Sequence, residues 1–266
     1  MFRDMFNFIK KIYYVFVCSS RKHLRYYIGY SYFVKNREHQ VEFGKNTVKV
    51  FPFQKLSPCG NSVHILCSGP SVNKINELGK LFSRPVIVMN GSHKIYQGTE
   101  VVFDYYVVSD IGFVKRNWEL FAEGISKSNN LLFDHRVIVE ALRLDSSIFN
   151  KKKIYVFDLF KRPYNKKLSK HNPTFSIDAK RGFNSSKTVA FLAMQLVVAM
   201  GYKEVVFFGM DLNSKSRFYP ENTQEKSMID ADFIQIQEDF GHASEICQKK
   251  GIQVLNACPD SRLPEG

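Results

Sequence analysis

The first residues that could carry out chemistry in this 266-residue chain form a turn of small side chains. Ser68-Gly69-Pro70-Ser71 directly follows the apolar run VHILC. A helix that begins at such a turn presents backbone N–H groups and its dipole to an anion. Neither GKS/T nor GxGxxG follows, so Walker and dinucleotide-binding loops are excluded. The turn predicts phosphate or carboxylate binding, although the same residue types also form ordinary strand-to-helix turns.

Further apolar runs also end in short polar side chains. Asn90-Gly91, Ser109-Asp110, Asp211 and Asn256 each stand at the end of one run. An asparagine there can read a base or a sugar hydroxyl. An aspartate can accept a proton in catalysis or can cap the next helix. Uncharged and acidic hydrogen-bonding groups of this kind favour a nucleotide-sugar pocket over a site for a bare polyphosphate.

The apolar runs themselves predict the fold class. They read VHILCSGPS, RPVIVMNGS, FDYYVVSD, NLLFDH, KKIYVFD, EVVFFGMDL and IQVLNACP, and helical stretches separate them. Strands that alternate with helices predict an α/β fold, with a Rossmann-like, mostly parallel sheet and helices on both faces. We expect one nucleotide-binding domain over residues 63–266. Ligands of such sheets bind outside the carboxyl ends of the strands.

Three other segments complete the predicted organisation. The nearly continuous apolar run from Ser185 to Met200 predicts a central helix that Gly201 ends. Residues 161–183 lack periodicity and carry many lysines, which predicts a mobile, basic, lid-like loop. Residues 37–62 are expected to be a linker or a short hairpin. Apolar residues recur every three or four positions in residues 1–20, which predicts an amphipathic helix.

The net charge of +13 is concentrated in two segments. Residues 1–36 carry +6 and residues 151–181 carry +8, so the remaining 199 residues sum to −1. The first segment has no long uncharged run and no cleavage site, so it favours a helix lying on an anionic membrane surface over a span or a signal peptide. Docking of that helix on the protein core, and plain solvated surface for both segments, are the alternatives.

Metal and disulfide chemistry are not predicted. None of the five cysteines forms a close pair such as CxxC, so a reducing compartment is expected. Asp230-Ala231-Asp232 matches the DxD triplet of metal-dependent glycosyltransferases in letters, but it lies in a helical run and not at a strand end. We therefore expect no metal and no cofactor.

The stretch RGFNSSKTVAFLAMQLVVAMGYKEVVFFGMDLNSKSRFYPE resembles the lipopolysaccharide core Kdo (3-deoxy-manno-octulosonic acid) transferases of the WaaZ type. The resemblance covers about Val63 to Asn256, and its most specific part is RFY placed after GMDL. A fainter resemblance extends to the bacterial CMP-sialic acid sialyltransferases. Both families use CMP-sugar donors, so the resemblance implies a metal-independent glycosyltransferase, with an inverting displacement.

The resemblance also implies roles for single residues, by matched motif position. The predicted donor-binding residues are Ser68, Gly69, Pro70, Ser71, Asn90, Gly91, Ser109, Ser185, Ser186, Thr188, Tyr219 and Asn256. Tyr219 falls on one of two tyrosine positions that stabilise the leaving phosphate in sialyltransferases, whereas Asn213 stands at the other. The basic residues expected to hold an anionic acceptor are Lys166, Lys167, Lys170, Arg181 and Arg217.

The predicted catalytic residues are Asp110, His242 and Asp211. Asp110 matches the acid of a Kdo-transferase strand end and is the first candidate for the general base. His242 lies near the position of the sialyltransferase histidine but several residues closer to CPDS, and a lone histidine is often structural. Asp211 stands near the end of the predicted strand EVVFFGMDL.

These features together predict a CMP-Kdo transferase that acts on a lipopolysaccharide or lipid A-core acceptor, in the cytoplasm and peripheral to the inner membrane. The alternatives are a CMP-sialic acid-dependent sialyltransferase of lipooligosaccharide and a basic nucleic-acid-binding module. Nucleic acid is not an expected partner, because the chain has no RNP motif, KH loop or helix-turn-helix spacing. The acceptor sugar, the linkage and the oligomeric state are left open.

Overall fold

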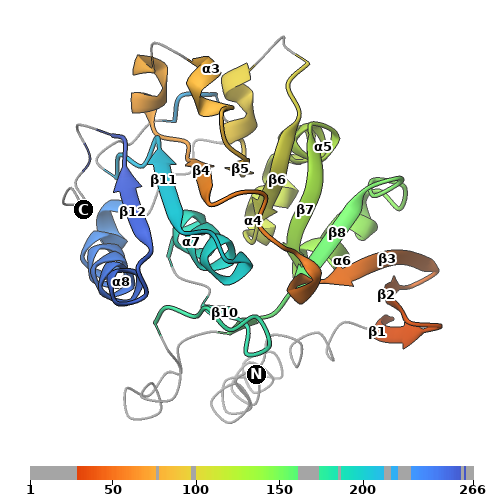
Figure 1. Cartoon of the computed structure of the whole chain (residues 1–266). Coiled ribbons are helices and arrows are strands. Elements are labelled where there is room, and N and C mark those ends of the chain that lie inside the picture. Colours follow the sequence, from red (N-terminus) through yellow and green to blue (C-terminus); the bar gives the residue numbers. More distant parts are fainter. Residues whose placement is uncertain are drawn as a thin grey trace, which may run out of the picture.

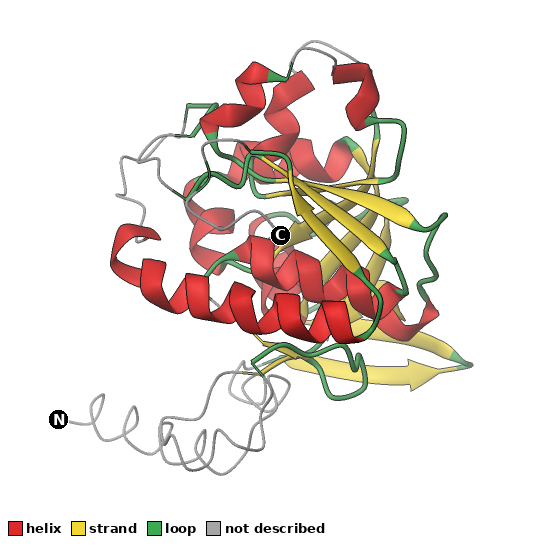
Figure 2. Ribbon diagram, turned by 60° about the vertical axis from the view of Figure 1, so that its left-hand side comes forward, coloured by secondary structure: helices red, strands yellow, loops and turns green. Residues whose placement is uncertain are grey.

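The computed structural model describes residues 29–75, 78–96, 100–160, 174–184, 187–212, 217–220, 229–258 and 261. One large twisted sheet runs through these residues, and helices cover both of its faces (Figure 1 and Figure 2). The predicted α/β fold with a mostly parallel sheet is therefore confirmed. Residues 1–28 of the predicted basic N-terminal segment and residues 161–173 of the predicted mobile loop lie outside the described residues. The described parts of both segments are packed in the fold: Tyr30–Lys35 form a strand of the sheet, and Phe175, Ser176 and Phe183 of the loop are buried.

The large sheet has ten strands in the order β1-β2-β3-β8-β7-β6-β5-β4-β11-β12. Their bounds are Tyr30–Lys35 (β1), Glu38–Phe43 (β2), Asn46–Pro52 (β3), Ser62–Leu66 (β4), Val86–Met89 (β5), Phe103–Val108 (β6), Ser128–Asp134 (β7), Lys153–Phe157 (β8), Glu204–Phe208 (β11) and Gln253–Asn256 (β12). β2 runs in the opposite direction to the other nine strands, which are all parallel to one another. Leu159–Phe160 (β9) and Phe183–Asn184 (β10) form a separate parallel pair. Each of the seven predicted runs contains one strand of the large sheet.

The helices lie between the strands, as the sequence pattern predicts. The α-helices are Leu78–Leu81 (α3), Ile111–Arg116 (α4), Trp118–Ser126 (α5), His135–Leu144 (α6), Val189–Met200 (α7) and Ile229–Lys249 (α8). Short 3-10 helices span Phe53–Lys55 (η1), Pro70–Lys74 (η2) and Ser92–Tyr96 (η3). In Figure 1, α7 and α8 lie beside β11 and β12, whereas α5 and α6 lie beside β7 and β8.

Alternating strand residues build two separate cores, because successive side chains in a strand point to opposite faces. In β6, Tyr105 and Val107 belong to the core that includes α7 and α8. Tyr106 and Val108 belong to the core on the other face, with α4, α5 and α6. The sheet is thus covered on both sides, which explains why its central strands are apolar throughout.

The strand order reverses at β4. Strands β4 to β8 follow one another across the sheet, and the chain then returns so that β11 pairs with the other side of β4. The register places Ser62 opposite Glu204 and Leu66 opposite Phe208. In sheets of this kind the crevice beside such a reversal is where ligands bind. The turns after β4 and β11 meet there.

The segment predicted as a linker or a short hairpin, residues 37–62, contains a hairpin whose strands belong to the sheet. β2 and β3 form an antiparallel hairpin, and β3 joins the sheet by pairing with β8 at Phe51 and Tyr155. Val41 and Val50 are buried in the core, and β2 contacts α6. These strands escaped the sequence reading because polar residues such as those in EHQVEF alternate with the few buried ones.

The central helix α7 begins at Val189, four residues later than predicted, because the Thr188 side chain caps it by accepting from the Ala190 N–H at 3.2 Å. Gly201 ends it in the left-handed conformation, as predicted. Within α7, Gln195 is fully buried. Its Oε1 accepts from the backbone N–H groups of Ser176 at 2.9 Å and Asn184 at 3.0 Å.

We predict that Gln195→Leu lowers the free energy of unfolding by about 3 kcal/mol, because two buried N–H groups lose their acceptor. Urea denaturation followed by circular dichroism measures the change. Gln248→Leu, on the exposed side of α8, is the matched control and should shift stability by less than about 0.5 kcal/mol. Equal effects of the two substitutions would contradict the assigned role.

Candidate functional site

Asp211 connects the turns that follow β4 and β11. Its carboxylate is buried, and Oδ2 accepts from the Ser71 N–H at 2.9 Å while the Ser71 hydroxyl donates to Oδ1. The Gly69 N–H donates to the Gly209 carbonyl oxygen at 2.9 Å. Two of the turn's backbone donors are therefore satisfied by the protein itself.

This arrangement differs from the predicted anion site at the turn. Pro70 begins a five-residue 3-10 helix and not an α-helix, so the turn lacks the dipole of a long helix. The Ser71 N–H, one of the backbone donors expected to bind an anion, already donates to the Asp211 carboxylate. The other hydroxyl of this turn, that of Ser68, does not bind Asp211 but a residue further along the chain.

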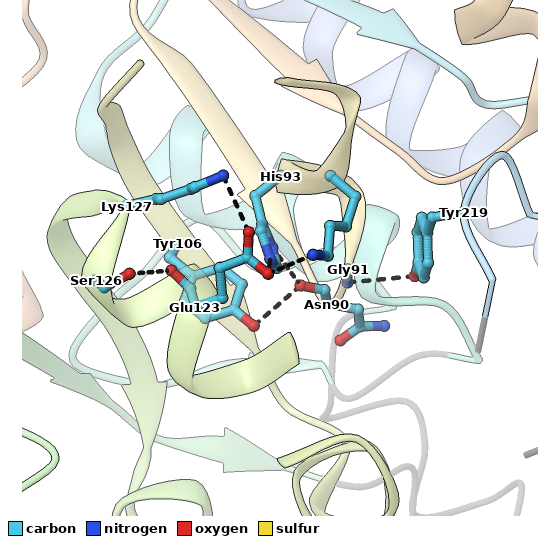
Figure 3. Close-up of polar contacts among 9 residues, drawn as sticks. Asn90, Gly91, His93, Tyr106, Glu123, Ser126, Lys127 and Tyr219 are labelled. Carbon is cyan, nitrogen blue, oxygen red and sulfur yellow. Dashed lines mark hydrogen bonds and ion pairs between the residues drawn. The ribbon is translucent and has the colours of Figure 1, made fainter. Parts of the chain in front are cut away.

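That partner belongs to the RFY triplet, which links the ends of β4 and β5. The Arg217 guanidinium donates from Nη1 to Ser68 Oγ at 3.0 Å, and the Phe218 N–H donates to the Ser68 carbonyl oxygen at 3.2 Å. Tyr219, the last residue of the triplet, accepts with its Oη from the Gly91 N–H at 3.2 Å (Figure 3). The triplet therefore brings Ser68, Arg217, Tyr219 and Gly91 into one place.

Gly91 is required there by its contact with Tyr219. A Cβ atom at position 91 would overlap the Tyr219 ring carbons. The preceding residue, Asn90, has a φ of +49°, in the left-handed region that asparagine tolerates better than most residues. Its Oδ1 atom is buried and has no hydrogen-bond partner among the described residues.

Asp110 ends β6, the next strand across the sheet. Its Oδ1 accepts from the Gly112 N–H at 2.8 Å, so it is the N-cap of α4. Its Oδ2 lies 3.5 Å from Arg116 Nη2, and the side chain is 49% exposed. The neighbouring Ser109 is half-buried. Asp110 thus combines the structural role considered for it with a carboxylate that solvent still reaches.

The other predicted site residues make contacts of their own or lie outside the described residues. Thr188 caps α7, and Asn256 Oδ1 accepts from the Cys258 N–H at 3.3 Å in the turn after β12. Arg181 is exposed in the turn before β10. Residues outside the described part of the chain include Lys166, Lys167, Lys170, Ser185 and Ser186.

His242 is not brought to the strand ends. It is exposed on α8, about 20 Å along a helix that begins at Ile229, at 1.5 Å per residue. Because α8 leads back to the start of β12, its beginning lies toward the carboxyl edge of the sheet and His242 lies toward the opposite edge.

Sequence reasoning missed a buried polar group behind the β5 turn. His93 is fully buried, and burial lowers its pKa to about 4, so the ring is neutral at pH 7. Its Nε2 lies 3.7 Å from Glu123, whose carboxylate also binds Lys94 at 2.6 Å and Lys127 at 3.0 Å (Figure 3). The nearness of His93 to the NGS turn was the only sequence signal.

Metal binding and thiolate chemistry find no support in the described residues. They contain no group of three or more His, Cys, Asp or Glu side chains placed to hold a metal ion. Burial raises the pKa of the Cys67 and Cys258 thiols beside the β4 turn, so both stay protonated at neutral pH. None of the described helices is both long and apolar enough to cross a membrane.

Comparison with known proteins supports the predicted sequence resemblance. No protein-family model matches the chain. The probable 3-deoxy-manno-octulosonic acid transferase of Escherichia coli (strain K12) is 25% identical over 228 residues, which cover 76% of this chain and 80% of that protein. The similarity to a Kdo transferase, predicted from motifs, is therefore confirmed.

One solved glycosyltransferase has a similar arrangement of strands and helices. The MAf glycosyltransferase from Magnetospirillum magneticum AMB-1 matches with a TM-score of 0.50 and 14% identity over 79% of this chain, which spans 35% of that protein's length. The sialyltransferase CstII from Campylobacter jejuni matches with a TM-score of 0.44 and 15% identity, over 76% of this chain and 83% of CstII. The likeness to the MAf glycosyltransferase concerns the fold alone, and nothing further is concluded from the likeness to CstII.

We predict that Gly69→Ala lowers the free energy of unfolding by about 2 kcal/mol or more, because the new Cβ would lie 2.6 Å from the Gly209 carbonyl oxygen, a backbone atom that cannot turn away. Chemical denaturation measures the loss. Gly79→Ala, in α3, is the matched control because a Cβ there meets nothing within 4 Å. If both variants were as stable as the parent protein, the closed turn would not be a constraint.

Proposed function

We propose that this protein is a metal-independent glycosyltransferase that transfers Kdo from CMP-Kdo to a lipopolysaccharide inner-core acceptor. The observation that carries the proposal is the joining of the β4 and β5 ends by Arg217 and Tyr219, at the point where the strand order reverses. The 25% identity to a probable 3-deoxy-manno-octulosonic acid transferase supports the same donor class.

The residues at these strand ends suit a nucleoside monophosphate leaving group. Such a group gains less charge than a diphosphate, so one guanidinium with hydroxyl groups can stabilise it. Arg217 supplies the charge, in place of the acceptor-binding role that the sequence suggested for it, and Ser68 and Tyr219 supply hydroxyls. In this proposal Asp211 binds no substrate. It keeps the Ser68 turn in position through Ser71.

Asp110 is our candidate for the base that takes the proton from the acceptor hydroxyl. It stands at the carboxyl end of β6 beside β5, and half of its side chain remains exposed. His242 is the second candidate, and its position on α8 counts against it. The displacement would release CMP and invert the configuration of the transferred sugar.

In this proposal one basic segment binds the acceptor and the other binds the membrane surface. Lipid A and the inner core carry phosphates and carboxylates, which the lysines of residues 161–173 together with Arg181 would bind. Residues 1–36, at +6, would hold the enzyme on an anionic, cytoplasm-facing membrane surface.

The direct test is a donor screen. We expect the full-length protein to release CMP from CMP-Kdo when lipid A-core acceptor is presented in anionic vesicles, to keep this activity in EDTA, and to sediment with those vesicles more than with neutral ones. Turnover of CMP-sialic acid alone would identify a sialyltransferase. If neither donor were used, the proposed function would be wrong.

Asp110→Asn separates the two roles of Asp110, because asparagine still caps a helix but cannot accept a proton. We expect kcat for Kdo transfer to fall about 100-fold or more with little change in stability. Asp145→Asn is the matched control, since Asp145 likewise accepts from a backbone N–H, that of Ser147, far from the strand ends. A full rate in Asp110→Asn together with a lost rate in His242→Gln would assign the base to His242.

A further inference from the structure

The peptide unit between Asn90 and Gly91 is held at both ends. Its carbonyl oxygen, on Asn90, accepts from Tyr106 Oη at 2.9 Å and lies 3.2 Å from His93 Nδ1. Its N–H, on Gly91, donates to Tyr219 Oη at 3.2 Å. Figure 3 shows these partners converging on one turn from β6, η3 and the RFY triplet. The orientation of this peptide fixes the ψ angle of Asn90.

The conformation held in this way is one that an L-residue adopts only at a cost. Asn90 has a φ of +49°. A non-glycine residue in the left-handed region is disfavoured, so it persists where neighbouring groups determine it. A carbonyl oxygen has two lone pairs, and Tyr106 and His93 together use both.

Tyr106 is built into the fold to reach this carbonyl. The residue is fully buried, and its ring packs against Phe121 and Phe133. Gly124 in α5 makes room for it, because a Cβ at that position would overlap the Tyr106 ring. Burial raises the pKa of the Tyr106 hydroxyl far above its ordinary value, so it remains a donor.

His93 acts from the other side of the turn. The ring is neutral, and its contact with a carbonyl oxygen requires the hydrogen to be on Nδ1. Nε2 has no hydrogen-bond partner among the described residues, and Glu123 lies 3.7 Å away, held by Lys94 and Lys127. The edge of the His93 ring also contacts the Tyr106 ring, with centroids 5.9 Å apart.

The arrangement leaves one group unsatisfied. Asn90 Oδ1 is buried without a donor among the described residues, although a buried acceptor normally has one. The side chain stands at the carboxyl end of β5, beside Tyr219 (Figure 3). A ligand N–H or O–H group at this edge would complete it.

We propose that Tyr106 and His93 are positioning residues, which hold the Asn90–Gly91 peptide so that the Asn90 carboxamide accepts a hydrogen bond from an amino or hydroxyl group of the donor nucleotide. The proposal rests on the proposed function, because that function supplies the nucleotide. Neither residue touches the substrate in this proposal, and both act through Asn90.

A double-mutant cycle tests this coupling, with CMP as the probe and calorimetry as the measurement. Tyr106→Phe keeps the ring and removes the hydroxyl, so we expect the Kd for CMP to rise about three- to tenfold. Asn90→Gly removes the carboxamide and keeps the left-handed backbone accessible. In the Asn90→Gly background, Tyr106→Phe should have little further effect. Two full, additive losses would overturn the proposal, because a general structural role predicts additivity.

His93 is tested by replacing its donor. His93→Phe should weaken CMP binding about as much as Tyr106→Phe does, whereas His93→Asn restores an N–H near the Nδ1 position and should recover most of the affinity. Equal losses in both variants would remove His93 from the role.

Tyr105→Phe is the matched control. Tyr105 precedes Tyr106 in β6 but faces the other core, where its hydroxyl lies 3.4 Å from Tyr202 Oη. Its loss should leave the Kd for CMP unchanged even if stability falls. An increase in Kd equal to that of Tyr106→Phe would show that any buried hydroxyl in β6 matters, and the proposal would be wrong.

Amide hydrogen exchange separates this proposal from the proposed function. Without ligand, Tyr106→Phe should speed exchange of the Gly91 N–H several-fold, and Tyr105→Phe should not. If the wild-type protein failed to bind CMP while this difference appeared, the proposed function would fail and the positioning of the peptide would stand. If CMP bound but exchange and the mutant cycle showed no effect of Tyr106→Phe, the function would stand and this proposal would fail.

Discussion

The buried carboxylate of Asp211 is the interaction around which this edge of the sheet is organised. A carboxylate removed from water must receive hydrogen bonds, and the Ser71 N–H and hydroxyl supply them. The same contact brings the β4 turn against the β11 turn and leaves no room for a side chain at Gly69. Because the protein fills its own anion position, our proposals assign recognition of the ligand to the neighbouring side chains of Ser68 and Asn90.

The two aspartates at the strand ends, Asp110 and Asp211, differ in their exposure to solvent. Asp110 and Asp211 both end a central strand, and both accept from backbone N–H groups close by. Asp211 is 4% exposed, whereas half of the Asp110 side chain meets solvent. Two residues that are equivalent in a strand pattern therefore differ in what they can offer a substrate, and burial alone makes the difference.

The fold was predictable where one periodicity dominates, and the site was not. Continuous apolar runs identified β4 to β8, β11 and β12, because buried parallel strands need apolar side chains on both faces. The β2–β3 hairpin has only one buried face, so its short mixed pattern left a linker and a hairpin equally open and did not show that it joins the sheet. Ser68, Asn90 and Asp110 could be placed at strand ends from sequence. The partners of Ser68 and Asn90 could not, because Arg217 and Tyr106 meet them only through tertiary contacts with no fixed spacing along the chain.

The reversal of strand order at β4 also has a consequence for how the chain reaches its folded state. β4 and β5 are close together in the sequence, but the other partner of β4, β11, is far away, because the paired residues Ser62 and Glu204 are 142 positions apart. Until β11 emerges from the ribosome, one side of this central strand has unpaired N–H and C=O groups and can pair with another chain. Pairs so distant in sequence also form slowly. The edge of the sheet where these strand ends meet should therefore form late, and an interrupted chain would expose a strand that can pair with other chains.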